Sequence, residues 1–370
     1  MRFVIFTHSL VSDWNHGNAH FLRGIASELL SLGHELRIFE PKDGWSRQNL
    51  LREQGQVAID EFERAFPHLR STLYDDSTLD LDGALYGADV VIVHEWNPPG
   101  LIARIGRHRA AHDYMLFFHD THHRSVSDRN SIAVYDLRHF DAVLAYGSVI
   151  RDAYLQHGWA ARAWTWHEAA DTRVFRPLSW VKRGDLVWIG NWGDDERADA
   201  LREFLIEPVR KLGIRARVYG VRYPPEALRD LAKAGIEYGG WLPNYKAPEI
   251  FAQYSVTIHV PRRPYVEALP GIPTIRPFEA MACGIPLISA RWNDCEGLFS
   301  QGEDYLMARN TSEMTSHLST LLSQSVMRDR LREHALQTIR SRHTCMHRVK
   351  ELFSFLASSQ LVGALEESRG

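Results

Sequence analysis

The chain has 370 residues, of which 45% are hydrophobic and 24% are charged, and its formal net charge is −3 at pH 7. A chain of this length and composition can bury large cores, and we expect it to form two globular domains. The small negative charge excludes a general attraction to polyanions. We therefore expect no nucleic-acid partner and at most peripheral contact with a membrane.

The cysteines and the apolar stretches indicate a compartment. Cys283, Cys295 and Cys345 are too few and too scattered for a disulfide framework or a thiolate metal site, which fits a reducing environment. Residues 1–8 are too short and too soon interrupted for a signal peptide, and no later stretch reaches the roughly 18 apolar residues of a membrane helix. We therefore expect a cytoplasmic protein.

The chain opens with a strand, a helix and a second strand. Residues 3–6 are apolar, the apolar residues between 22 and 30 recur at helical spacing before Gly33, and residues 35–39 form the next apolar run. This β-α-β order predicts a parallel sheet with right-handed crossovers. The connecting residues 9–18 are polar and longer than a tight turn, so we expect a ligand-binding loop.

Two further strands deliver polar clusters to one edge of this sheet. Residues 45–66 are predicted to be helical before them, with Leu50, Leu51, Val57, Ile59 and Phe62 available for burial. Residues 89–93 form a buried strand that ends at His94, Glu95 and Trp96, and residues 114–118 form another that ends in a His-Asp-Thr-His-His run. With a further strand at residues 140–145, the first half reads as a doubly wound sheet.

A second set of strands and helices follows a boundary. Pro177 and the polar run 182–185 are typical of a domain boundary. Strands are predicted at residues 186–189, 216–219 and 256–260, and Arg197 is expected to open a helix that runs to Leu212. The turn from Gly190 to Gly193 lets backbone N–H groups approach a diphosphate, with Arg197 as a counter-charge. From Thr311 to about Leu356 the sequence is predicted to be helical.

Residues 274–289 carry the densest set of position-specific signals. Pro277 suits the first helical position and Gly284 the left-handed residue that ends a helix, so we predict a helix over residues 277–283 and a buried strand over 285–289. Arg276 at the helix start can hold a phosphate oxygen, and Glu279 can accept hydrogen bonds from sugar hydroxyls. Together they predict a nucleotide site, although Glu279 could merely complement the helix dipole.

The run from Arg276 to Pro286 resembles the E-A-M-A-C-G-x-P signature of GT-B glycosyltransferases, in particular the family-4-like and CgeB-like group (glycosyl transferases group 1). Residues 169–177 likewise resemble the D-x-x-x-F-x-P segment that closes the first domain of such enzymes. The resemblance implies an α/β GT-B fold, in which two Rossmann-like doubly wound domains face a cleft and the last helix crosses back. It implies an acceptor domain over residues 1–172, a donor domain over 173–345 and a returning helix over 346–370.

The resemblance also implies roles for individual residues. Glu279 would bind the donor ribose, and residues 239–244 resemble the segment whose backbone reads the donor base. Many relatives have a second Glu eight positions before the signature Glu, where this chain has Gly271 and where Glu267 is the nearest carboxylate. The predicted donor-binding residues are Gly190, Asn191, Arg197, Tyr219, Gly240, Trp241, Leu242, Arg262, Arg276, Pro277, Phe278 and Glu279.

Glycosyl transfer needs a general base for the acceptor or a group that stabilises the developing positive charge of the sugar. By resemblance His119 lines the donor sugar, and Asp120 is the base if the reaction inverts, with Asp13 and Glu95 as further candidates. Aromatic rings on the first-domain loops can stack on an acceptor. The predicted acceptor-binding residues are Trp14, Asn18, Glu95 and Trp96.

The leading hypothesis is a metal-independent hexosyltransferase that moves a sugar from a nucleoside diphosphate sugar to a small-molecule or glycan acceptor, with no other cofactor. Retention and inversion both stay open. A rival hypothesis is a metal-dependent hydrolase, because imidazole and carboxylate groups bind zinc or iron. Its ligands would be His119, Asp120, His122, His123, His94 and Glu95. A GT-B sugar epimerase or a non-catalytic nucleotide-sugar binder is a third possibility.

Overall fold

The computed structural model describes residues 1–367 and divides into two compact units. The first comprises Met1–His167 together with the segment from Cys345 onward, and the second comprises Glu168–Thr344. The predicted boundaries, after residues 172 and 345, lie within a few residues of these divisions. Each unit is built around one parallel sheet.

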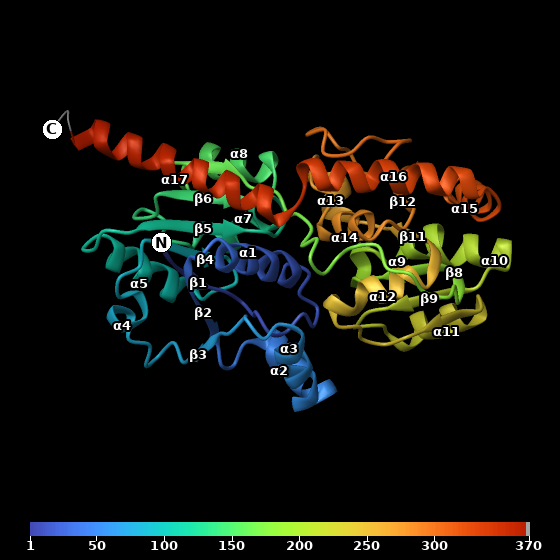
Figure 1. Cartoon of the computed structure of the whole chain (residues 1–370), viewed down its shortest axis with the longest axis horizontal. Helices are drawn as coiled ribbons and strands as arrows, with labels where there is room; N and C mark the ends of the chain where they lie inside the picture. Colours follow the sequence, from blue (N-terminus) through green and yellow to red (C-terminus); the bar gives the residue numbers. More distant parts are fainter. Residues whose placement is uncertain (368–370) are drawn as a thin grey trace. The chain divides into compact units, whose positions relative to one another are not determined.

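The first unit contains a seven-stranded sheet in the order β3-β2-β1-β4-β5-β6-β7, and every neighbouring pair is parallel (Figure 1). The central strands are apolar because both faces of the sheet are covered, so the doubly wound sheet predicted from the sequence is confirmed. Its strands are β1 (Arg2–Phe6), β2 (Glu35–Pro41), β3 (Thr72–Tyr74), β4 (Val90–His94), β5 (Met115–Asp120), β6 (Ala142–Ala145) and β7 (Ala163–Thr165).

Two helices replace the single one expected over residues 45–66. Gly55 adopts a left-handed φ of 73° and ends the first of them, because a helix cannot continue through that conformation. Val57, expected to be available for burial, is 56% exposed. The helices of this unit are α1 (Ala19–Ser31), α2 (Trp45–Gln54), α3 (Gln56–Ala65), α4 (Leu81–Leu85), α5 (Pro99–Arg109), α6 (Arg124–Ser127), α7 (Arg129–Ala133), α8 (Ser148–Gln156) and α17 (Cys345–Glu367).

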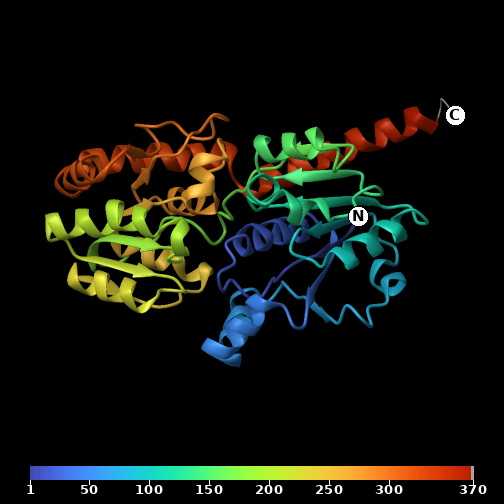
Figure 2. The same ribbon diagram turned by 180° about the vertical axis from the view of Figure 1, so that it is seen from behind.

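The second unit contains a six-stranded sheet in the order β10-β9-β8-β11-β12-β13, again parallel throughout (Figure 2). Its core includes Leu186 and Trp188 of β8 and Val256 and Ile258 of β11. The strands are β8 (Gly184–Ile189), β9 (Ala216–Tyr219), β10 (Ile236–Tyr238), β11 (Tyr254–His259), β12 (Leu287–Ala290) and β13 (Leu306–Ala308).

The helix expected from Arg197 to Leu212 has three parts, because its middle turn is widened into a π-helix at η2. Pro208 follows this turn and has no N–H to donate to the preceding turn, so the widening accommodates it. The helical segments of the unit are η1 (Asp194–Glu196), α9 (Ala198–Leu201), η2 (Arg202–Ile206), α10 (Glu207–Leu212), α11 (Pro225–Lys233), η3 (Asn244–Lys246), α12 (Ala247–Ala252), α13 (Arg263–Glu267), α14 (Ile275–Cys283), α15 (Thr311–Ser323) and α16 (Ser325–Arg342).

The signature helix α14 begins two residues before the predicted start. Pro277 is therefore its third residue rather than its first, which is tolerated because the N–H groups of the first turn have no partner within the helix. Glu279 lies beyond the first turn, so it does not complement the free N–H groups there. The expected left-handed Gly284 is confirmed, with φ of 67°, and β12 follows two residues later than predicted.

The last helix, α17, packs against α1 within the first unit, as expected of the returning helix (Figures 1 and 2). The indole Nε1 of Trp166 donates a 2.8 Å hydrogen bond to the carbonyl of Arg348, and the ring of Trp164 stacks on Phe355 at 4.9 Å between centroids. None of the helices in the part of the chain described, which ends at Glu367, is long and apolar enough to cross a membrane.

Leu352→Ala should lower the free energy of unfolding by about 2–5 kcal/mol, because the Leu352 side chain on α17 is fully buried and its removal leaves a cavity. Urea denaturation followed by tryptophan fluorescence measures this loss. The matched control is Ser354→Ala on the exposed side of the same helix. Equal stability of the two variants would contradict the role of α17 as part of the first core.

Candidate functional site

Strand order locates a crevice in each unit. Six strands of the first sheet and all six of the second follow one pattern. When the strands of each unit are counted in chain order, the first (β1 or β8) lies between the second (β2 or β9) and the fourth (β4 or β11). In such sheets ligands bind outside the carboxyl ends of the first and fourth strands, where the strand order reverses. These ends belong to β1 and β4 in the first unit and to β8 and β11 in the second.

In the second unit, the loop after β8 is held rigidly by the loop after β9. The side-chain oxygen of Asn191 accepts a 2.9 Å hydrogen bond from the Val221 N–H, and the hydroxyl of Tyr223 donates to the Gly190 carbonyl at 2.8 Å. A β-carbon at position 220 would lie 2.1 Å from the Gly190 carbonyl oxygen, so only glycine permits this approach. The predicted glycine turn is therefore a fixed platform.

Three arginines gather beside this platform. Arg197 donates a 3.0 Å hydrogen bond to the Asn191 carbonyl, and its Nε is buried without a hydrogen-bond partner. Burial, together with the positive charges of Arg262 and Arg276, lowers the pKa of Arg197 to about 9. Since this shift reflects the cost of holding the charge there, the structure brings together three predicted donor-binding residues around a site that favours an anion.

Two of the three arginines pair with carboxylates. Arg262 lies 3.3 Å from a carboxylate oxygen of Glu196, and Arg276 forms an ion pair with Glu279. Among the side chains that the structure describes, which do not include that of Asp194, no carboxylate forms an ion pair with Arg197. Its guanidinium donates instead to the neutral carbonyl of Asn191.

His259, the last residue of β11, belongs to the same cluster, and sequence reasoning missed it. Its Nδ1 lies 2.9 Å from the Ser289 hydroxyl, and its Nε2 is buried without a partner. Burial, followed by the charges of Arg197 and Arg276, lowers the pKa of His259 to about 3, so the imidazole is neutral. The sequence did show a histidine near the end of the strand predicted over residues 256–260, shortly before the basic residues Arg262 and Arg263.

Glu279 has a fixed orientation and no exposed surface. One carboxylate oxygen accepts a 2.6 Å hydrogen bond from the side-chain amide of Asn244, and the other pairs with Arg276. Asn244 lies in η3, in the segment expected to read a base, but its contact with Glu279 was not predicted. A sugar hydroxyl that binds Glu279 would therefore compete with Asn244.

The other predicted donor residues are dispersed. Tyr219 ends β9, and the segment 240–242 follows β10, where the indole N–H of Trp241 is buried without a hydrogen-bond partner. Phe278 packs against Phe299 and His343, so its side chain belongs to the core, and Pro277 is buried beside it in α14. Only the backbone of these two residues is left for the predicted donor contact.

A carboxylate occupies the space beside Gly271, where the family pattern expects a glutamate. Gly271 lies in the connection between β11 and α14 with a φ of 88°, and its N–H donates a 2.6 Å hydrogen bond to the Asn293 carbonyl. A β-carbon at this position would lie 2.5 Å from the Oε1 atom of Glu296. The positive φ favours glycine at position 271, and the carboxylate of Glu296, on the loop after β12, fills the space beside it.

In the first unit, four histidines cluster at the ends of β1, β4 and β5. Ring centroids are 4.8 Å apart for His8 and His16, 6.3 Å for His16 and His94, and 5.4 Å for His94 and His119. Burial lowers the pKa of all four, to about 4 for His8 and about 3 for His119. The Nε2 atoms of His8 and His119 are buried without partners, so neutral imidazoles with unused hydrogen-bonding capacity line this edge.

His119 and Asp120 lie on opposite faces of the sheet, because neighbouring strand residues alternate. His119 contacts Trp166 and His94, whereas Asp120 accepts a 2.8 Å hydrogen bond from the Tyr154 hydroxyl and a 3.0 Å one from the His122 N–H. Both oxygens of Asp120 are therefore engaged inside the unit, and the two predicted catalytic residues do not form one joint group.

Glu95 completes a buried acid pair with Asp120. Its carboxylate accepts a hydrogen bond from the Thr121 N–H at 2.9 Å and forms an ion pair with Arg124 at 2.7 Å. Burial raises the pKa of both carboxyl groups, and for Glu95 the charge of Asp120 raises it further. The arrangement favours one proton shared by the pair, balanced by the single charge of Arg124.

Among the remaining predicted residues of this unit, some are held by contacts within the protein and one presents an exposed ring. Asp13 forms a 2.9 Å buried ion pair with Arg23, and the indole of Trp14 donates to Glu53 at 2.7 Å. Asn18 is the N-cap of α1 but makes no capping hydrogen bond through its side chain. Trp96 is 37% exposed, and the guanidinium of Arg124 lies 4.1 Å from its ring centroid. Of the predicted acceptor residues, Trp96 is the one that presents a ring.

The ligands of the alternative hydrolase site do not come together as one metal site. Among the described residues, the one group of three metal-ligating side chains with ligand atoms within 4.8 Å of one another is Asp82, His108 and His112. The ligands proposed for the hydrolase make separate contacts instead: Asp120 accepts a hydrogen bond from Tyr154, and Nδ1 of His123 lies 2.6 Å from the Ser127 hydroxyl. A hydrolytic metal centre at this edge would need a rearrangement of buried side chains.

His119→Gln should reduce the pH dependence of stability. Folding lowers the pKa of His119 from about 6.5 to about 3, because burial disfavours the charged imidazole. Protonation of His119 therefore costs the folded protein no stability above pH 6.5, and the free energy of unfolding decreases as the pH falls from 6.5 toward 3. Between pH 4 and 5.5 the slope of unfolding free energy against pH should fall by about 1.4 kcal/mol per pH unit. Urea titrations measure it, with exposed His157→Gln as the control. An unchanged slope for His119→Gln would refute a buried neutral imidazole.

Comparisons with known proteins bear on the fold. Residues 197–354 match the family model described as glycosyl transferase-like. HepE of Anabaena, solved with UDP and glucose, has a TM-score of 0.69 at 13% identity over 97% of this chain and 100% of its own. Sucrose-phosphate synthase from Thermosynechococcus elongatus has a TM-score of 0.67 at 13% identity, over 98% and 100%.

A third solved structure extends the likeness. An alpha-glucosyltransferase in complex with UDP-glucose and DNA containing an abasic site has a TM-score of 0.68 at 14% identity, over 96% of this chain and 99% of that one. The search of curated protein sequences gives no significant match. The chain thus has the GT-B fold, and its residues 197–354 are similar to the glycosyl transferase-like family.

Proposed function

We propose that this protein is a glycosyltransferase that moves a sugar from a nucleoside diphosphate sugar to an acceptor hydroxyl. The observation that carries the proposal is the cluster of Arg197, Arg262 and Arg276 at the carboxyl ends of β8 and β11, in which burial and the two neighbouring charges lower the pKa of Arg197. A diphosphate supplies the anion that this cluster favours, and guanidinium groups bind phosphate oxygens in fork geometry.

The adjoining residues fit the rest of the donor. Glu279 is the hydroxyl acceptor beside the arginines, which suits a ribose, and the segment 240–242 offers an aromatic ring and backbone groups for a base. Several structurally similar enzymes were solved with UDP or UDP-glucose, so we propose a UDP-hexose as the first donor to test. We propose a small-molecule or glycan acceptor rather than DNA, because the chain has no net positive charge.

The reaction increases negative charge at the arginines. The bond between the anomeric carbon and the diphosphate oxygen breaks, the acceptor oxygen bonds to that carbon, and the nucleoside diphosphate leaves with one more negative charge. Fixed guanidinium groups therefore bind the leaving group more strongly than the intact donor, which accelerates the reaction. In this proposal they supply the positive charge, so we expect transfer without a divalent cation.

The acceptor hydroxyl must also lose its proton. We propose that the unpartnered Nε2 of His119 accepts a hydrogen bond from the acceptor hydroxyl. Because burial lowers the pKa of His119 to about 3, the imidazole is a weak base and takes the proton only after the oxygen has bonded to the anomeric carbon, when that proton is strongly acidic. Asp120 is less suited in this arrangement, since both of its oxygens are engaged by Tyr154 and His122. Its proposed part is to share the proton of the buried acid pair with Glu95.

Arg197→Met should abolish most donor binding while leaving the free protein as stable as before or more stable. The loss of one charged contact to phosphate costs about 1.5–3 kcal/mol of binding, or roughly 10- to 150-fold in affinity. Calorimetry with UDP and UDP-glucose, and urea denaturation without ligand, measure the two effects. Arg202→Met is the matched control, because Arg202 pairs with Asp199 at 2.9 Å on the same segment.

Unchanged affinity in Arg197→Met would reject the donor site. Release of UDP from UDP-glucose in the presence of sugar acceptors then tests transfer itself. Tight binding without any release or transfer would favour the non-catalytic binder, and a change in the sugar of the recovered nucleotide would favour the epimerase.

Glu296→Gln should weaken binding of UDP-glucose but not of UDP. We propose that the Glu296 carboxylate, seated against Gly271 at the carboxyl edge of the sheet, accepts hydrogen bonds from hydroxyls of the donor sugar. The loss should be about 1.5–3 kcal/mol, as for a hydrogen bond to a charged group. Calorimetry with both ligands gives the difference, and Glu267→Gln is the control. Equal losses for UDP and UDP-glucose would place Glu296 away from the sugar.

A further inference from the structure

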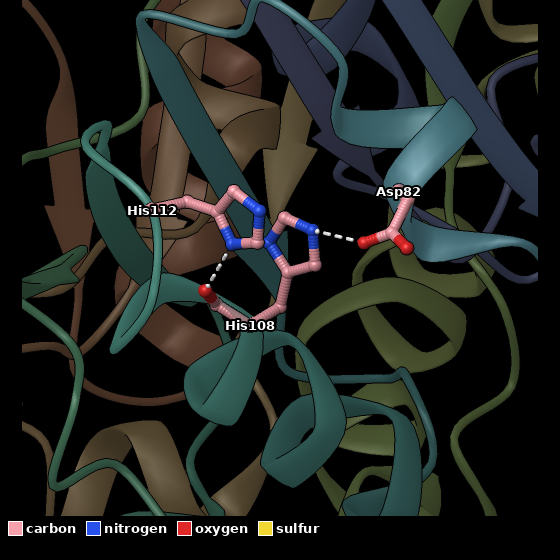
Figure 3. Close-up of side chains that lie close together, drawn as sticks. All are labelled: Asp82, His108 and His112. Atoms are coloured by element: carbon pink, nitrogen blue, oxygen red, sulfur yellow. Dashed lines mark hydrogen bonds and ion pairs between the residues drawn. The ribbon is translucent and has the colours of Figure 1, made fainter.

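A cluster of metal-ligating side chains lies outside the proposed active site. Figure 3 shows Asp82 from α4, His108 from the last turn of α5 and His112 from the connection to β5 pointing toward one another. One ligand atom from each lies within 4.8 Å of the others. Because α5 returns from the carboxyl ends of the strands to the start of β5, the cluster is at the opposite edge of the sheet from the four buried histidines.

Hydrogen bonds fix which imidazole nitrogen of His112 is free for a ligand. Its Nδ1 lies 2.8 Å from the carbonyl oxygen of His108 (Figure 3). A carbonyl can only accept, so Nδ1 carries the hydrogen and Nε2 keeps its lone pair. The side chain of His112 is thus already in the tautomer that binds a metal through Nε2.

His108 already holds the Asp82 side chain beside it. Its Nε2 lies 3.1 Å from the Asp82 carboxylate, which can only accept, so Nε2 carries the hydrogen in the metal-free protein. Its Nδ1 then accepts a hydrogen bond from the Tyr114 hydroxyl, 3.1 Å away. A metal ion would replace the hydrogen on Nε2, and the carboxylate already lies next to the nitrogen that would bind it.

The imidazole rings of His108 and His112 are stacked at 3.9 Å between centroids and 7° between planes. One ligand atom of each ring lies within 4.8 Å of the Asp82 carboxylate, so a single ion can draw all three side chains together.

We propose that Asp82, His108 and His112 bind one divalent transition-metal ion, with zinc as the best match and water as the fourth ligand. A nitrogen or oxygen ligand lies about 2.0–2.2 Å from zinc, which separates tetrahedral ligands by roughly 3.3 Å. Asp82 and His112 are exposed, so their side chains can close this gap and His112 can turn out of the stack without repacking the core. Tyr114 supplies the contact that orients a ligating histidine.

The metal would join α4 to the connection between α5 and β5. The site lies at the opposite edge of the sheet from the carboxyl ends of the strands, so we assign the metal a structural role, separate from sugar transfer. Its expected consequence is a higher melting temperature of the first unit when zinc is bound, because a ligand that binds only the folded state stabilises it.

Zinc titration of the chelator-treated full chain tests the proposal. Calorimetry should show one zinc site whose affinity falls at least tenfold in His112→Ala and in Asp82→Asn. The exposed histidine variant His157→Ala, in the same unit, should bind zinc as the wild type does. Zinc should raise the melting temperature of the wild type and of His157→Ala but not of His112→Ala, and Co²⁺ should give a tetrahedral visible spectrum that these two cluster variants lose.

The result that overturns the proposal is equally direct. Absence of saturable zinc binding, or equal affinity in the wild type and both cluster variants, would reject the site. Loss of zinc binding in His119→Gln with full binding in His112→Ala would place the ion at the buried histidines and would also reject it. Binding of UDP and UDP-glucose is independent of these outcomes, since none of the three residues belongs to the donor cluster.

Discussion

The order of the strands is the constraint on which both candidate sites depend. Because the first strand of each sheet lies between the second and the fourth, the connections after the first and fourth strands leave toward opposite faces. Their carboxyl ends are left uncovered by helices. In the second unit this places the Gly190 platform beside His259 and Arg262, and in the first unit it places His8 beside His94.

The two units place opposite electrostatic environments at these strand ends. The second gathers arginines, and burial followed by the charges of Arg262 and Arg276 lowers the pKa of Arg197, so that charge is costly to hold in the free protein. The first gathers imidazoles that burial keeps neutral, since it lowers the pKa of His8 to about 4 and that of His119 to about 3. A group that attracts an anion and a group that accepts a hydrogen bond in its neutral form need such contrasting surroundings.

Sequence patterns predicted the elements well and the side-chain contacts poorly. Buried strands such as residues 89–93 and the left-handed Gly284 follow from local rules, whereas the break at Gly55 and the early start of α14 required knowledge of packing. The opposite orientation of His119 and Asp120 was predictable from the two-residue period of a strand. The contacts of Asn244 with Glu279 and of Glu296 with Gly271 were not, since they join segments far apart in the chain.

The likeness to solved glycosyltransferases, at 13–14% identity for the three compared, establishes a common fold and leaves the chemistry to be argued from the site. A unit built only for stability has no use for Arg197, because an apolar residue there would avoid the cost of burying a guanidinium beside Arg262 and Arg276. The same reasoning applies to the unpartnered Nε2 of His259. Groups that lower stability and that converge at the carboxyl ends of β8 and β11 are most economically explained by a ligand that completes them, and the positive sign of the arginines favours an anionic one.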